Sequence, residues 1–227
     1  MMNVIRRLST SGALLSIALF GSSARAQTAP TAADLFFHHF DIGVSGVGEF
    51  TPNNAGPNYL SQTVSQRPST TLGALVEVRY TKSPLVGLQF NYGYARYTDD
   101  FTVTNGAGTP GGSTQYVLGA QTKVSEFTLG YVAHLHEFHG VTPIVGGGGG
   151  AIAFRPTPGG GQGLPPELRG AFYYSLGVEK DIYTDHVGIR AQFRQLFFGA
   201  PDFNQNYLAN GQRSFTIEPS IGFYLRF

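Results

Sequence analysis

The chain has 227 residues, of which 31 are glycine, 18 phenylalanine and 12 tyrosine, and only 13% are charged. This composition is too aromatic and too poorly charged for a disordered chain, and the length suits a single domain. The chain contains no cysteine, so disulfide bonds do not stabilise its fold, and its formal net charge is +1.

The N-terminus has the features of a secretory signal peptide, which we predict to cover residues 1–26. Arg6 and Arg7 precede an apolar stretch at 8–20, and Ala24-Arg25-Ala26 provides an A-x-A cleavage site. The apolar stretch is too short to cross a bilayer as an anchor. We therefore expect the protein to be exported.

Cleavage would change the charge of the mature chain. It would remove three arginines and leave 12 basic residues against 14 acidic ones, a net charge of about −2, which argues against nucleic acid as a partner. After residue 26 no uninterrupted apolar run reaches about 18 residues, so we expect no transmembrane helix. Residues 27–36 would form a short N-terminal segment, and residues 37–227 the folded domain.

Eight segments of the mature chain alternate apolar with polar or small residues. Only an extended strand can use a period of two to separate two environments. The segments are 37–50, 71–81, 85–98, 123–135, 141–154, 171–182, 187–197 and a terminal strand at 215–227. The segment at 141–154 is so rich in glycine that its facing is ambiguous.

The connections between these segments alternate in length. Three are tight turns, at 82–85, 136–140 and 183–186. The others are longer and rich in Gly, Pro, Asn and Gln, and they cover 51–69, 99–122, 155–169 and 199–212. Short turns at one rim and long loops at the other are the plan of an outer-membrane barrel. We therefore predict an all-β fold, an eight-stranded antiparallel up-and-down transmembrane β-barrel.

The two faces of the predicted strands differ in charge. One face is almost purely Phe, Tyr, Leu, Val and Ile. The other carries eight charged residues: Glu77, Arg79, Glu126, Glu179, Arg190, Arg194, Glu218 and Arg226. The alternative all-β fold is a soluble lipocalin-type barrel with its apolar face inward. Because charges that face lipid are costly near the bilayer centre, we predict instead that all eight point into the lumen of a membrane barrel.

The end of the chain resembles the C-terminal assembly signal of outer-membrane barrels. Ser220, Gly222, Leu225 and Phe227 match its polar, glycine, hydrophobic and terminal aromatic positions. The resemblance implies that the C-terminal strand is bound by periplasmic chaperones and by the barrel assembly machinery. It also implies a location in the cell outer membrane.

Three stretches, TPIVG at 142–146, LGVE at 176–179 and TDHVGIRAQFR at 184–194, carry a wider resemblance. They are similar to the P-Y-V-G-x-G-x-G, G-x-G-V-D/E and T-D-x-W/V-G-L/I-R-x-E-Y/F-R stretches of the small outer-membrane β-barrel family that includes outer membrane proteins A and X. Gln192 departs from this pattern where an acid is common. Pro219 removes a ladder donor from the terminal strand, so we predict a β-bulge there. Members of the family share a fold more than an activity, so the resemblance implies location rather than function.

The lumen of an eight-stranded barrel is narrow enough for side chains to fill it. Four acids and four bases point inward in the prediction, which favours a paired polar core over an ion path lined by the same charges. We therefore predict a structural outer-membrane protein with a plugged lumen, which contributes to envelope integrity or adhesion. The alternative is a narrow porin or a small-molecule transporter, such as a conduit for apolar compounds with a lateral opening. The expected partners are outer-membrane lipid and lipopolysaccharide, and the chain is expected to be monomeric.

Three further patterns predict no additional activity. His134-x-His136-x-x-His139 with Glu137 resembles a metal spacing, but a polar periplasmic rim accounts for it better, and we expect no metal or cofactor. Gly146–Gly150 lacks the Lys-Ser/Thr of a phosphate loop and fits a strand that bends sharply. All six histidines fall near the predicted periplasmic rim, without a nucleophile motif beside them, so we do not expect an enzyme.

The long loops carry side chains of the kind that binding surfaces use. These are Asn53, Asn54, Tyr59, Phe101, Asn206 and Tyr207. Nothing in their pattern specifies a ligand, so they indicate only a surface available for recognition.

Overall fold

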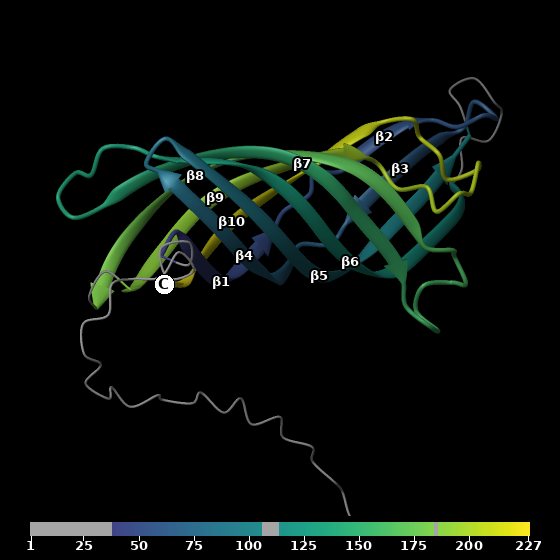
Figure 1. The fold of residues 1–227 in the computed structure, drawn as a ribbon. Helices are drawn as coiled ribbons and strands as arrows, with labels where there is room; N and C mark the ends of the chain where they lie inside the picture. The colour runs from purple at the N-terminus through teal and green to yellow at the C-terminus, as the bar shows by residue number, and fades with distance from the viewer. Residues whose placement is uncertain (1–37, 106–113, 184–185) are drawn as a thin grey trace, which may run out of the picture.

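The computed structural model describes residues 38–105, 114–183 and 186–227, which form one antiparallel β-sheet (Figure 1). Its ten strands are β1 (Phe40–Glu49), β2 (Asn54–Pro57), β3 (Thr63–Pro68), β4 (Thr71–Ser83), β5 (Val86–Thr104), β6 (Thr114–His134), β7 (Thr142–Pro156), β8 (Glu167–Tyr183), β9 (Val187–Gly199) and β10 (Arg213–Arg226). The predicted signal peptide at 1–26 and the segment at 27–36 lie outside the described residues. Within those residues, no helix is long and apolar enough to cross a membrane.

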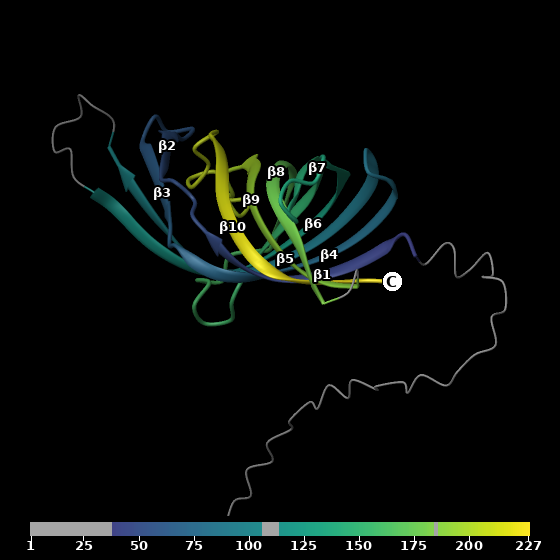
Figure 2. The ribbon, with the colours of Figure 1, turned by 90° about the vertical axis from the view of Figure 1, so that its left-hand side faces the viewer.

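Eight of the strands close into a barrel. β1 pairs with β4 on one side and with β10 on the other, and β5 pairs with both β4 and β6. From β6 to β10 each strand pairs with the next along the chain. Every one of the eight therefore has two neighbours, and Figure 2 shows β1 and β10 side by side where the ring closes. The predicted eight-stranded antiparallel up-and-down barrel is confirmed.

The two remaining strands, β2 and β3, form a hairpin within the connection that we predicted as a loop at 51–69. β3 pairs with the far end of β5, where Thr63 is opposite Thr104, and Figure 1 shows the hairpin at the end of the barrel away from the C-terminus. The predicted loop at 99–122 was wrong over most of its length, because β5 and β6 both extend into it. The composition of this stretch suggested a loop, yet buried and exposed residues alternate along β5 as far as Thr104.

β7 is the glycine-rich strand whose facing was ambiguous from sequence. Ile144, Ile152 and Phe154 are buried and lie on the inward face of the strand. β7 approaches β6 so closely that a Cβ added at Gly150 would lie 2.0 Å from the carbonyl oxygen of Phe127. The glycine there permits an approach of two backbones that no side chain would allow.

Pro219 leaves a gap in the ladder between β1 and β10 instead of the bulge that we predicted. Val47 pairs with Ser220 and Phe50 with Ile217 in one unbroken register, so the intervening Pro219 stands opposite Gly48. The pairing of β10 with β9 also passes through Pro219 without a shift. Proline has no N–H to donate, so the ladder loses a hydrogen bond at this point but keeps its register.

The barrel interior has two zones. Toward the short turns the buried side chains are charged or polar, and Glu77, Arg79 and Arg190 are at most 1% exposed. Toward the long connections an apolar zone is formed by Val64, Tyr97, Phe101, Val103, Leu118, Ala120, Val124, Ile152, Phe154, Tyr173, Leu196, Phe198, Phe203 and Leu208. Phe101, which we expected on a loop surface, is fully buried in this zone. Only the charged zone was expected from the sequence.

Candidate functional site: the charged lumen

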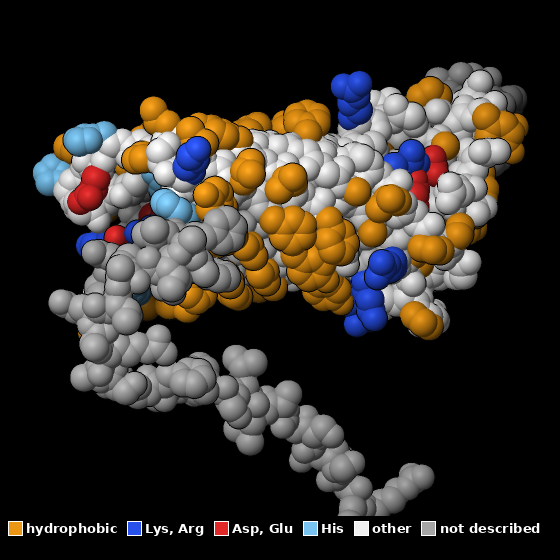
Figure 3. Space-filling model, in the orientation of Figure 1, with side chains coloured by type: hydrophobic (Ala, Val, Ile, Leu, Met, Phe, Trp, Pro, Cys, Tyr) orange, Lys and Arg blue, Asp and Glu red, His pale blue; other side chains and the backbone are white. Residues whose placement is uncertain are grey.

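The wall of the barrel separates an apolar exterior from a charged interior. Large hydrophobic side chains are exposed on the outer face, for example Leu129 at 59% and Phe223 at 65%, and Figure 3 shows them as a broad band. The same wall buries Arg79, Arg190 and Arg194 to 1% exposure or less. A soluble barrel would have the opposite arrangement, so the exterior of this one suits lipid.

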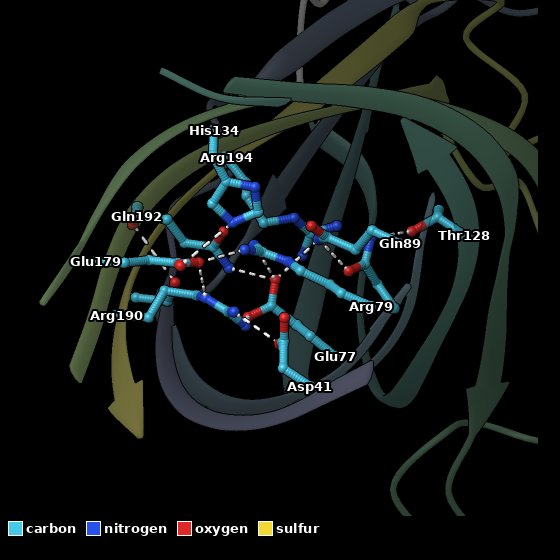
Figure 4. Close-up of polar contacts among 12 residues, drawn as sticks. Asp41, Glu77, Arg79, Gln89, Thr128, His134, Glu179, Arg190, Gln192 and Arg194 are labelled. Atoms are coloured by element: carbon cyan, nitrogen blue, oxygen red, sulfur yellow. Dashed lines mark hydrogen bonds and ion pairs between the residues drawn. The ribbon is translucent and has the colours of Figure 1, made fainter. Parts of the chain in front are cut away.

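Two charge clusters lie in the lumen, and we call the one nearer the short turns the lower cluster. Arg190 is its centre, because the guanidinium contacts acids from three other strands (Figure 4). Its Nε donates to Oε1 of Glu179 in β8 (2.7 Å) and its Nη1 to Oε2 of Glu77 in β4 (3.2 Å). Its Nη2 donates to Oδ1 of Asp41 in β1 (2.8 Å). The guanidinium carbon also lies 4.9 Å from the ring centroid of Tyr224. One buried side chain of β9 thus links four strands through charge-assisted hydrogen bonds.

Arg79 completes the lower cluster from the opposite side of the lumen. It donates to Glu179 and, over 3.3 Å, to Oε1 of Glu77 in its own strand. The same Glu77 oxygen accepts from the side-chain amides of Gln89 (2.8 Å) and Gln192 (2.9 Å). Such partners are needed because a buried charge without them is far more costly than a paired one.

Arg194 forms an upper cluster, four residues further along the same face of β9. It donates to Glu126 of β6, and its Nη1 lies 2.9 Å from Oε2 of Glu218 in β10. Its guanidinium carbon lies 4.9 Å from the ring centroid of Tyr173. The upper cluster therefore repeats the plan of the lower one, with an arginine held by acids of other strands and covered by a tyrosine.

Neutral side chains join the two clusters into one network. Gln89, which donates to Glu77, also donates to Asn91. Asn91 Nδ2 donates to Oγ1 of Thr128 (3.0 Å), and the Thr128 hydroxyl donates to Oε1 of Glu126 (2.8 Å). The charged zone is thus a continuous hydrogen-bonded plug along the lower and middle lumen.

The plug ends at the mouth beside the short turns, where the side chains of Arg226 and His134 approach Glu179. The side chain of Arg226 is 34% exposed and its Nη2 lies 3.7 Å from Oε2 of Glu179, whereas Nε2 of His134 lies 3.3 Å from the same oxygen. A pocket opens here, lined by His38 and His39 among others. Arg226, predicted with the lumen charges, therefore lies at the mouth rather than inside.

Little space remains between the plug and the apolar zone. The cavity bordered by Glu49, Glu126 and Glu218 has a volume of about 10 Å³. That volume is about what one water molecule requires.

The connection between β9 and β10 covers the opposite end of the barrel. It folds inward, so that Phe203 and Leu208 are buried in the apolar zone. Glu167, the first residue of β8, accepts hydrogen bonds from the backbone N–H groups of Asp202 (3.0 Å) and Phe203. Arg169 pairs with Glu167 and with Asp202. Charged side chains thus occupy one half of the lumen and apolar side chains the other.

The structure places all eight predicted lumen residues on the inward face, and seven of them are buried. It adds Asp41 to the charged members, His134 at the mouth, and Gln89, Asn91, Thr128 and Gln192 to the neutral members. Asp41, His134 and Gln192 contact residues of non-adjacent strands, whereas Gln89, Asn91 and Thr128 bond within their own or neighbouring strands. Glu167 was missed because it lies where a loop was expected, and Glu49 because it lies at the end of a strand.

The residues of the predicted assembly signal take part in the finished wall. Ser220 and Gly222 face inward, whereas Leu225 and Phe227 face outward and are each 44% exposed. A Cβ added at Gly222 would lie 2.1 Å from the carbonyl oxygen of Val44, so a larger residue would push β10 away from β1. Recognition of these residues by the assembly machinery stays a prediction.

Comparison with known proteins relates the chain to others by its fold. No protein-family model matches the chain, and no curated protein is similar to it in sequence. The structure of Neisserial surface protein A matches with a TM-score of 0.51 and 14% identity, over 83% of this chain and 97% of that one. The outer membrane protein OprG from Pseudomonas aeruginosa matches with a TM-score of 0.56 and 12% identity, over 83% of this chain and 95% of that one. With its apolar exterior and its buried charges, the chain has the fold of the small outer-membrane β-barrels, and its surface suits a location in the outer membrane.

Proposed function

We propose that this protein is a structural barrel of the outer membrane, closed along its axis, which contributes to envelope integrity and offers its extracellular end for adhesion. The observation that carries this proposal is the set of contacts around Arg190, which joins β9 to β1, β4 and β8 from inside the lumen. Such contacts stabilise the ring and at the same time occupy the space that a solute would need.

The ordered extracellular end supports the adhesive part of the proposal. The connection between β2 and β3 exposes Tyr59 (69%) and Leu60 (55%) at its tip. Asn58 holds this tip, because its Oδ1 accepts from the backbone N–H groups of Leu60 (2.9 Å) and Gln62 (3.0 Å). Exposed aromatic and aliphatic side chains on an ordered turn are suitable contacts for a partner.

Single-channel recording in planar bilayers tests the closed lumen. Only preparations whose folded form shifts on unheated gels should be used, so that misfolded protein does not contribute. The expected result is no conductance above leak for the wild type. Reproducible conductance steps that change on Arg190→Ala or Glu126→Gln substitution would contradict the proposal and make the charged lumen a pathway.

A second candidate function is transport of small apolar compounds through the wall. It is favoured by the gap at Pro219, where the ladder between β1 and β10 lacks a hydrogen bond. Beside this gap lies an outer pocket lined by Gly46, Gly48 and Pro219, among other residues. Because the chain has no cysteine, a Gly48→Cys, Pro219→Cys pair can close the gap with a single disulfide. Transport would require wild-type protein to speed entry of an apolar dye into vesicles, and the disulfide to stop that entry reversibly. Equal rates with and without the disulfide would exclude this candidate.

A further inference from the structure

We propose that three basic residues of the outer wall, Arg96, Lys123 and Arg155, bind the phosphate groups of a bisphosphorylated glycolipid in the outer leaflet. The inference rests on the location in the outer membrane that the proposed function assumes. It does not depend on whether the lumen conducts.

The three residues stand in a row across three neighbouring strands. Arg96 of β5 is directly opposite Lys123 of β6, and Lys123 is directly opposite Arg155 of β7. All three side chains face outward and are exposed. Since adjacent strands lie about 4.8 Å apart, the row is about 10 Å long. A row of this length can contact more than one phosphate group of the same ligand.

No acid compensates these charges among the described residues. Arg96 Nη2 donates to Oε1 of Gln121 (2.5 Å), which is neutral, and neither Lys123 nor Arg155 forms an ion pair in the described part of the chain. Like charges directly opposite one another on a sheet are destabilising. An anion bound between them would remove this repulsion, and guanidinium groups suit phosphate in particular.

The row lies where lipid head groups meet the wall. On the outer face of β5, Arg96 directly follows the apolar residues of the lipid-facing band, of which Tyr92 and Tyr94 are the last. A transmembrane strand needs about 9–11 residues to cross the apolar layer, and β5 supplies nine from Val86 to Tyr94. Figure 3 shows Lys and Arg side chains on either side of the hydrophobic band. The row is therefore at the edge of the bilayer on the extracellular side, where an anionic head group would be.

The wall below Arg155 can receive an acyl chain. Going down β7 from Arg155, the outward positions are Ala153, Ala151, Gly149 and Gly147, which we call the small-residue strip. In register with the strip, β6 carries Phe127, Leu129 and Tyr131, and β8 carries Phe172 and Tyr174. Large side chains thus flank a strip of wall with none, directly below the basic row. Charge above and apolar surface below match a phosphorylated lipid better than a free anion or an acidic protein.

Native mass spectrometry of the folded protein, titrated with bisphosphoryl lipid A in detergent, tests the proposal. The triple variant R96Q/K123Q/R155Q removes the row. A matched control, R67Q/K180Q/R213Q, removes three outward-facing, exposed bases that are not neighbours of one another. Since each base near a membrane surface contributes a factor of roughly five in affinity, we expect the triple variant to bind roughly a hundredfold more weakly and the control to bind almost as the wild type does.

The same titration separates the possible ligands. Monophosphoryl lipid A and phosphatidylglycerol should bind the wild type more weakly than bisphosphoryl lipid A, and Ala151→Leu, which fills the strip, should weaken binding with the row intact. Displacement of the lipid by millimolar inorganic phosphate would show that the site binds a free anion rather than a lipid. Equal losses in both triple variants, or no loss in either, would overturn the site itself. Self-association of the wild type that the row variant loses, without lipid binding, would assign the row to a protein contact.

The proposed function can fail independently of this site. Conductance steps from wild-type protein would contradict the closed lumen and leave the lipid result unchanged. Lipid binding that is unchanged in the row variant would overturn the site. The barrel would still not conduct, so the proposed function would stand. Both triple variants should keep the wild-type gel shift, which shows that they fold.

Discussion

Replacing Arg190 by alanine would leave the carboxylates of Asp41, Glu77 and Glu179 without the guanidinium that now contacts all three. The arginine side chain is 1% exposed, so water cannot take its place without opening the wall. Removing one partner of a buried ion pair costs about 3–5 kcal/mol. Arg79 would still neutralise part of the charge on Glu77 and Glu179. We therefore expect the free energy of unfolding to fall by about 3–4 kcal/mol, near the lower end of that range.

Equilibrium unfolding in urea, with protein refolded into phospholipid vesicles, measures this loss. The chain has no tryptophan, so tyrosine fluorescence and the gel shift of the folded form report the folded fraction. The control is Arg213→Ala, which removes an exposed base from the other end of the adjacent strand, opposite Gly199, and should change stability by less than about 0.5 kcal/mol. Acidification should reduce the difference in the free energy of unfolding between variant and wild type, because it neutralises carboxylates that have lost their partner.

A loss below about 1 kcal/mol for Arg190→Ala would contradict a buried, water-free cluster, since that is the range of a solvent-exposed ion pair. Such a result would mean that water reaches the lower cluster and that the lumen is wet. A loss of the expected size that did not shrink at low pH would also count against the account. It would indicate that lost packing against Tyr224, rather than unpaired charge, destabilises the variant.

Three further substitutions test other parts of the barrel. Gly150→Val should abolish the gel shift of the folded form, because even its Cβ would lie 2.0 Å from a backbone oxygen of β6; a normal shift would show that the strands can separate. Pro219→Ala should raise the free energy of unfolding by about 1 kcal/mol, as a restored ladder bond with β1 outweighs the entropy that proline removes from the unfolded chain. An unchanged urea midpoint would indicate that the gap is already satisfied in another way. Glu167→Gln should speed cleavage of the connection between β9 and β10 by protease added outside vesicles, because a neutral amide oxygen accepts more weakly from its N–H groups; unchanged cleavage would show that apolar burial alone holds the connection.

The strands that the sequence predicted well are those in which a polar face meets an apolar one at every step. In β10 the alternation from Phe215 to Phe227 is nearly perfect, and the observed strand differs from the predicted one by only a few residues. The prediction failed where the inward face changes from charged to apolar. At Phe101 an apolar residue points inward and polar residues point outward, so a pattern built on an apolar exterior no longer recognises the strand.

The composition of the charged plug could be predicted, but its pairing could not. Alternation assigns Glu77 and Arg190 to the inward face, yet 113 positions separate them in the chain. Their contact depends on the register of every strand between them and on the tilt that closure imposes. Asp41 illustrates the limit, because its contribution follows only from the arginine that it contacts across the lumen.

The cross-lumen contacts also determine when in folding the plug can form. Arg79 of β4 and Glu179 of β8 are not neighbours in the sheet, and β9, which carries Arg190, is separated from β1 by β10. In an open sheet these cross-lumen partners would be too far apart, and only pairs within a strand or between adjacent strands, such as Arg190 with Glu179, would remain. The network is therefore satisfied only after β1 and β10 have met, and it then stabilises the closed ring against opening at that seam. Because Pro219 weakens the same seam, the interior charges stabilise the barrel where its backbone ladder is least complete.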